Sequence, residues 1–158
     1  MANYSFDLND HHEYLKKLEA EFADLKGDPI SSRHAMNFAM NAYHMLEWVW
    51  EHEPQIDQKF SDNSKFRAAV YRKCPAMKVM RDLSNGSKHT NIKLTQNPTV
   101  ASTEVHEGAF QADAFQADAF DVSALLVNMA DGTSHNFIDD AIAAMEFWMQ
   151  AFRDSFEI

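Results

Sequence analysis

The sequence predicts a mainly α-helical protein: a bundle of about five helices with a small antiparallel β hairpin or sheet inserted before the last helix. Three observations lead to this prediction. Apolar residues recur every three or four positions over long stretches of the chain. Gly and Pro occur four times each, as is typical of a chain dominated by regular elements. In residues 91–132 the helical period is lost, and short apolar segments bounded by turn residues replace it.

The first predicted helix covers residues 7–26 and ends at a Gly-Asp-Pro sequence. Its apolar seam repeats at alternating threes and fours: Leu8, His11, Leu15, Leu18, Phe22 and Leu25. We interpret His11 as an imidazole packed at the end of the bundle. A metal site formed by His11, His12 and Glu13 is the alternative.

The second predicted helix covers residues 31–53, with Ser31 or Ser32 as its N-cap and Pro54 as its stop. It is apolar over most of its circumference, so it should be the central and most buried helix. Five polar residues share one arc of about 120°: Asn37, Asn41, His44, Glu47 and Glu51.

This arc has two interpretations. It is either the solvated edge of the helix or a polar seam that faces the fourth helix. In the second case Glu47 or Glu51 would pair with the guanidinium of Arg81, because a buried Arg needs such a partner.

The third predicted helix covers residues 62–73, and the fourth begins near Pro75, which suits a first helical turn. The fourth helix either ends at Gly86 or continues through it towards residue 90. The last helix is expected over residues 134–156, where it closes the bundle.

Between the fourth and last helices we predict short strands at residues 91–94, 99–105 and 125–129. An internal duplication lies between them: AFQAD occurs at residues 109–113 and 114–118, followed by AFD at 119–121. Its period of five fits neither a strand nor a helix. We therefore interpret it as a hairpin or loop whose Phe110, Phe115 and Phe120 form an apolar patch, a candidate oligomer contact.

Composition favours a single domain over residues 1–158. The formal charge of −10 disfavours non-specific attraction to phosphate, yet eight of the fourteen Lys and Arg fall within residues 65–93. A single cysteine excludes an internal disulfide. The first residues do not resemble a signal peptide, and no apolar run approaches a membrane span, so we expect a cytoplasmic protein that is not bound to a membrane.

The most specific chemical feature is the fourth helix. Arg81, Asn85 and Lys88 follow one another at i, i+4 and i+7, and His89 lies close by. Arg81 followed by Asp82, a spacer and His89 resembles the Arg–polar–spacer–His motif of the HEPN superfamily, although the spacer is longer than is usual there. Together with WVW at residues 48–50, this stretch is also similar to helical proteins of bacteria and phages.

The resemblance implies a metal-independent ribonuclease of the toxin–antitoxin or phage-defence type, acting on RNA as a homodimer and without a cofactor. Arg81 would bind the phosphate, His89 would act as acid or base, and Asp82 would orient one of them, with help from Asn85. The supporting polar seam would be Asn41, His44, Glu47, Glu51 and Lys88.

Two alternatives remain open. The first is a non-catalytic helical interaction module with a protein partner, such as a phage or mobile-element accessory protein. The second is a metal site at His44 and Glu47, completed by Glu51, His52 or His34. Carboxylate-bridged bundles need Glu-x-x-His on two pairs of helices, and here the order is reversed and occurs once, so we expect no metal.

Overall fold

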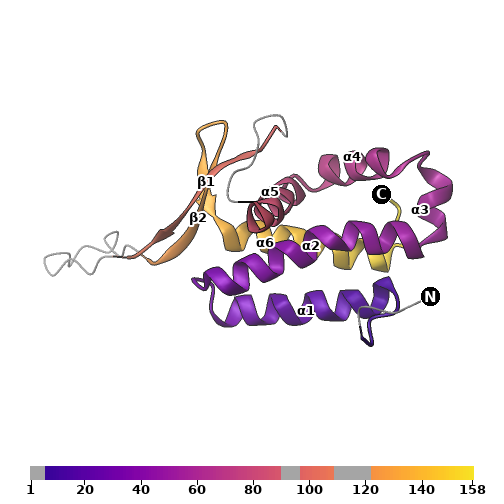
Figure 1. Cartoon of the computed structure of the whole chain (residues 1–158), viewed down its shortest axis with the longest axis horizontal. Coiled ribbons are helices and arrows are strands. Elements are labelled where there is room, and N and C mark those ends of the chain that lie inside the picture. The colour runs from indigo at the N-terminus through magenta and orange to yellow at the C-terminus, as the bar shows by residue number, and fades with distance from the viewer. Residues whose placement is uncertain (1–5, 90–96, 109–121) are drawn as a thin grey trace, which may run out of the picture.

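The computed structural model describes residues 6–89, 97–108 and 122–158, and over these ranges it contains six helices and three strands (Figure 1). The predicted mainly helical class, with a small antiparallel sheet before the last helix, is confirmed. The expected strand at residues 91–94 and the AFQAD repeat lie outside the described residues.

Four helices occupy the predicted stretches: α1 (His11–Gly27), α2 (Ser32–His52), α4 (Asn63–Lys73) and α5 (Ala76–Lys88). Side-chain oxygens of Asp10, Ser31 and Asp62 cap α1, α2 and α4 by accepting a backbone N–H three residues on. The cap at Asp10 explains why α1 starts at His11, later than expected. The helix α5 continues through Gly86 and ends where the His89 N–H donates to the carbonyl of Asn85 at 3.1 Å.

The short helix α3 (Pro54–Lys59) was not predicted. Pro54 was interpreted only as the stop of the second helix. In the structure it also occupies the first turn of α3, where its missing N–H has no intrahelical partner to lose. Glu53 connects the two helices, because its N–H donates to Val49 of α2 and its carboxylate accepts the N–H of Gln55.

The last helix, α6 (Phe137–Arg153), begins three residues later than expected. Residues 134–136 form a strand instead, and Asn136 caps α6 by accepting the N–H of Ile138. The predicted helical start at Ser134 was therefore wrong, because pairing with a neighbouring strand takes these three residues out of the helical period.

The sheet contains β1 (Val100–His106), β2 (Ala124–Met129) and β3 (Ser134–Asn136) in the order β1-β2-β3, with both pairs antiparallel. In the pairing of β1 with β2, Thr103 faces Val127 and Val105 faces Leu125. Gly132 turns the chain from β2 into β3 with φ of +90°. The β1–β2 ribbon extends away from the helices (Figure 1).

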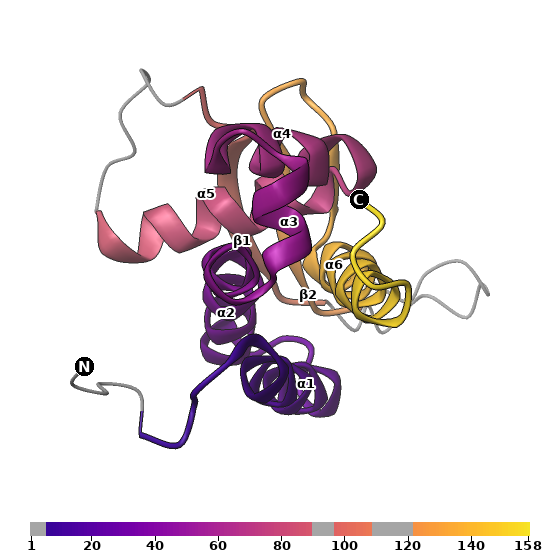
Figure 2. The same cartoon turned by 90° about the vertical axis from the view of Figure 1, so that its right-hand side faces the viewer.

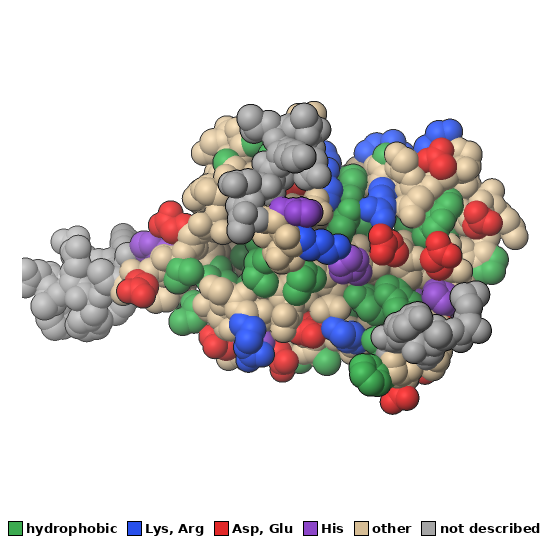
Figure 3. Space-filling model, viewed as in Figure 1, with side chains coloured by type: hydrophobic (Ala, Val, Ile, Leu, Met, Phe, Trp, Pro, Cys, Tyr) green, Lys and Arg blue, Asp and Glu red, His purple; other side chains and the backbone are tan. Residues whose placement is uncertain are grey.

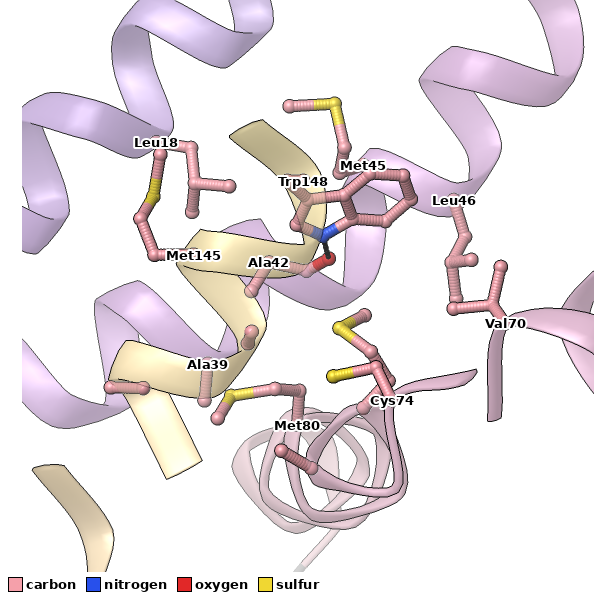
Figure 4. Packing of buried hydrophobic residues seen from close by; sticks show 14 of the residues in the cluster. Leu18, Ala39, Ala42, Met45, Leu46, Val70, Cys74, Met80, Met145 and Trp148 are labelled. Carbon is pink, nitrogen blue, oxygen red and sulfur yellow. Dashed lines mark hydrogen bonds between the residues drawn. The ribbon is translucent and has the colours of Figure 1, made fainter. Parts of the chain in front are cut away.

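Seen end-on, α2 lies between α1 and α5, and α6 lies beside α1, as expected for a central second helix (Figure 2). Trp148 of α6 is fully buried among residues of α1, α2, α4 and α5, and its Nε1–H donates to the carbonyl of Ala42 at 3.1 Å (Figure 4). The described methionines are all buried or partly buried. None of the described helices combines the length and the apolar character needed to span a bilayer.

Candidate functional site

The guanidinium of Arg81 is bound to the carboxylate of the next residue. Its Nε donates to Asp82 Oδ1 at 2.8 Å, and its Nη2 lies 2.7 Å from the same oxygen. A second contact joins Nη2 to the carbonyl of Asn97 at 3.3 Å, and the guanidinium lies 5.7 Å from the ring centre of Tyr71. The interpretation in which Arg81 pairs with Glu47 or Glu51 is therefore wrong.

Asp82 is the buried member of this pair, with its side chain 3% exposed against 21% for Arg81. Its second oxygen, Oδ2, accepts the backbone N–H groups of Thr99 at 2.5 Å and Val100 at 3.0 Å. These N–H groups belong to the residues that open β1. Arg81 and Asp82 thus fix the start of β1 to α5. The sequence pattern did not predict this structural role.

His89 lies at the end of α5, exposed to solvent, as does the neighbouring Lys88. Eight residues of helix place it about 12 Å further along the axis than Arg81. Asn85 lies between them, half-buried, and uses its carbonyl to close the helix. The helix therefore does not bring the guanidinium and the imidazole to one point.

The expected polar seam of α2 divides between two neighbours. Asn41 Oδ1 accepts the hydroxyl of Tyr14 at 2.8 Å and the ammonium of Lys17 at 2.7 Å, both from α1. Glu47 instead lies 3.2 Å from Arg67 of α4, with His44 3.7 Å away. Glu51 is exposed on α2.

Two arginines and two tyrosines form a continuous row across α2, α4 and α5, which we call the Arg–Tyr row: Arg67, Tyr43, Tyr71 and Arg81. Arg67 donates to the Tyr43 hydroxyl at 2.6 Å, and its guanidinium carbon lies 5.4 Å from that ring centre. Burial, followed by the nearby Tyr43, raises the pKa of Tyr71 to about 12, so its hydroxyl stays protonated at neutral pH. An open hollow of about 440 Å³ lies beside Arg67 and Tyr71.

The Arg–Tyr row is flanked by positive charge. Residues 63–88 contain one carboxylate, Asp82, and seven basic side chains: Lys65, Arg67, Arg72, Lys73, Lys78, Arg81 and Lys88. We call these seven side chains of α4 and α5 the basic face; within the set, Lys73 turns towards the C-terminal segment, where its Nζ donates to the carbonyl of Glu157. Several basic side chains gather over α4 and α5 in Figure 3. The side chains of Arg72, Lys78 and Lys88 have no hydrogen bond or ion pair to other described residues, so they are available to an external anion.

Metal binding finds no support in the described part of the chain, where no group of three or more His, Cys, Asp or Glu is arranged to hold an ion. Comparisons with known protein families, with curated proteins and with solved structures found no match. The function therefore has to be argued from the geometry of α4 and α5.

Proposed function

We propose that this protein is a HEPN-like helical module that binds RNA through the basic face and does not cleave it. One observation carries the proposal: the Arg81 guanidinium is held by Asp82, and Asp82 also holds the N–H groups of Thr99 and Val100. A phosphate-binding arginine needs its N–H donors for the ligand. Here Nε and Nη2 serve the fold, and the proposed binding surface lies beside them.

Cleavage by attack of the 2′-OH would need an acid–base group and a charge-stabilising group on the same phosphate. The separation of about 12 Å along α5 leaves Arg81 and His89 too far apart to act together within one chain. A homodimer could bring the His89 of one copy to the Arg81 of another, but Arg81 would still have to leave Asp82. Binding without cleavage requires no such rearrangement.

Phosphate contacts on the basic face would be made by side chains that the fold leaves available, above all Arg72, Lys78 and Lys88. Each phosphate neutralised releases a counterion, so binding should weaken steeply as salt rises. Tyr43 and Tyr71 are partly buried and each has a guanidinium over its ring, so we expect them to add less to RNA binding than the phosphate contacts do. The remainder of the chain is acidic, which should repel RNA and confine it to α4 and α5.

RNA binding in the cytoplasm, within a toxin–antitoxin or phage-defence system, is the setting that this proposal implies. It can be tested with fluorescein-labelled single-stranded RNA and fluorescence anisotropy in a salt series. Arg72→Gln, Lys78→Gln and Lys88→Gln should each weaken binding and reduce the slope of log affinity against log salt by about 0.7 per lost contact. Lys16→Gln, an exposed lysine of α1, is the matched control and should leave binding unchanged.

Equal effects of the control and the three variants would contradict the basic face as the binding surface. An anisotropy that does not respond to the protein would contradict RNA as the partner and favour the protein-binding module instead.

The ribonuclease remains the second candidate, because His89 is exposed beside Lys88, where it could approach bound RNA. The same RNA should stay intact with the protein in EDTA if the first proposal holds. Metal-independent cleavage that disappears in His89→Ala would replace binding alone with catalysis.

A further inference from the structure

The imidazole of His11 is buried where three helix ends meet: the start of α1, the end of α2 and the end of α6. It is 6% exposed, and neither ring nitrogen has a hydrogen-bond partner among the described residues. Its Nε2 lies 3.6 Å from Glu53 Oε2, which is too far for a hydrogen bond. Buried polar groups are almost always paired, so an unpaired imidazole calls for an explanation.

Aromatic rings enclose this imidazole. The ring centres of Phe152 and Phe156 at the end of α6 lie 5.4 Å and 5.7 Å away, and that of His12 lies 4.3 Å away. His52 of α2 follows at 6.2 Å. The site therefore suits a neutral ring and offers little solvation to a charged one.

The titratable groups around His11 come from two of the three helix ends. α1 contributes Asp10 and His12, while the end of α2 contributes His52 and the adjoining Glu53. Asp10 already accepts the N–H of Glu13 as the cap of α1. The end of α6 presents the rings of Phe152 and Phe156.

The segment after α6 is held in place by packing against this site. Ser155 and Phe156 both have left-handed backbone, with φ of 50° and 60°. This conformation costs about 1–2 kcal/mol for each L-residue. Phe156 is nevertheless buried, and its N–H donates to the carbonyl of Ala151 at 2.7 Å. The strained segment persists because the aromatic contacts outweigh its backbone cost.

We propose that His11 is an acid-sensitive latch, whose protonation releases residues 154–158 from the bundle and loosens the first turn of α1. An imidazolium at this position would lose its solvation among the aromatic rings that enclose it. Charged His12 or His52 would repel it further. Glu53 would oppose this through Oε2, 3.6 Å from Nε2, while its Oε1 stays on the N–H of Gln55, but burial remains the larger influence. The described residues before α1 and the residues after α6 both lie near this end of the bundle (Figure 1), so the release would act on both segments.

Burial, and then the neighbouring His12, lower the pKa of His11 below its usual value of 6.5. The folded state thus binds fewer protons than the unfolded state as pH falls through 6.5. The contribution of His11 to stability is complete above that pH and is lost below it.

The latch can be tested by amide hydrogen exchange between pH 7.5 and pH 5, expressed as protection factors that correct for the intrinsic rate. Protection of Phe156 and Ile158 should fall by up to about tenfold per pH unit below 6.5, while protection of Val127 in β2 should not change with them. In His11→Phe, which keeps an aromatic ring and cannot titrate, this local loss should disappear. In His12→Gln, the exposed neighbour, it should remain.

Two results would overturn the latch: equal protection of Phe156 at both pH values in the natural chain, or an unchanged pH response in His11→Phe. If His11→Phe does not fold, NMR titration of the His11 ring in the natural chain decides the question. A pKa at or above 6.5 there would overturn the latch without bearing on RNA binding.

Discussion

Asp82 Oδ2 accepts the N–H of Val100 at 3.0 Å, so a buried carboxylate of a helix fixes the first residue of a strand. This contact is one of those that join the sheet to the helices, beside the packing of β2 and β3 on α6. The same carboxylate binds Arg81 through its other oxygen. Several consequences for stability can be measured.

Asp82→Ala should lower the free energy of unfolding by about 3 kcal/mol, because it leaves the Arg81 guanidinium and two strand N–H groups without their acceptor. Urea unfolding measures the total, and hydrogen exchange of Thr99 and Val100 localises it. Arg81→Ala should cost less, about 1–2 kcal/mol, because Asp82 keeps both backbone donors. Glu51→Gln, which changes an exposed carboxylate of α2, is the control. If Asp82→Ala lowers the free energy of unfolding no more than this control does, the contacts of Asp82 do not stabilise the fold.

Trp148→Phe should destabilise the protein by about 2–3 kcal/mol, since it removes a buried hydrogen bond to Ala42 and leaves a cavity between α6 and α2. Calorimetric melting measures the effect. Trp50→Phe offers a matched substitution at a partly buried ring that stacks on Phe66, and its cost should be smaller. Equal costs at the two positions would show that the Ala42 contact contributes little.

The pair formed by His135 Nε2 and Asp140 Oδ2, 2.6 Å apart, should make stability depend on pH. Burial raises the pKa of Asp140 above its usual value, and the His135 imidazole opposes this rise. A carboxyl whose pKa is raised by folding holds its proton more tightly in the folded state, so its contribution to stability is present at low pH and is lost as pH rises through the raised pKa.

His135→Gln removes the opposing imidazole, so the pKa of Asp140 should rise further. The variant should therefore lose more stability at pH 7 than at pH 4, as measured by urea unfolding, and the Asp140 carboxyl can be followed by carbon NMR. A loss of equal size at both pH values would mean that the imidazole does not influence this carboxyl.

Two glycines offer a test of backbone conformation alone, because a Cβ added at Gly27 or Gly132 would meet nothing within 4 Å. Gly132 has φ of +90°, so Gly132→Ala should destabilise the β2–β3 turn by about 1 kcal/mol. Gly27 lies in the last turn of α1, and Gly27→Ala should stabilise by about 0.5–1 kcal/mol. Thermal melting of both variants should show shifts of opposite sign, and shifts of the same sign would contradict the argument.

The sequence was informative where local chemistry decides structure. Helical periodicity placed α4 and short apolar segments bounded by turn residues placed β1 and β2 close to their observed bounds. The buried face of α6 was less predictable, since Ile142 is a large apolar residue and is 39% exposed. Small residues such as Ala141 and Ala144 are buried in its place, because they let α6 approach its neighbours closely, and a hydrophobic pattern weighs them lightly.

The candidate site was less predictable than the fold. Arg81 and Asp82 were recognised as important, but their tie to Thr99 and Val100 spans 17 or 18 positions and has no local signal. The contacts of Arg67 to Tyr43 and Glu47 likewise depend on how α2 and α4 pack. That the Arg81–His89 motif does not cleave RNA stays a prediction, which the cleavage assay tests.

The β1–β2 ribbon also determines where the sequence can gain or lose residues during evolution. Gly108 N–H donates to the hydroxyl of Ser123 at 3.0 Å, which ties the two strands together just before the duplicated AFQAD sequence begins and just after it ends. Copies of five residues can therefore be gained or lost beyond this tie without shifting the register of β1 on β2. Such a position tolerates growth by unequal recombination, and it offers an insertion point for a tag or reporter peptide.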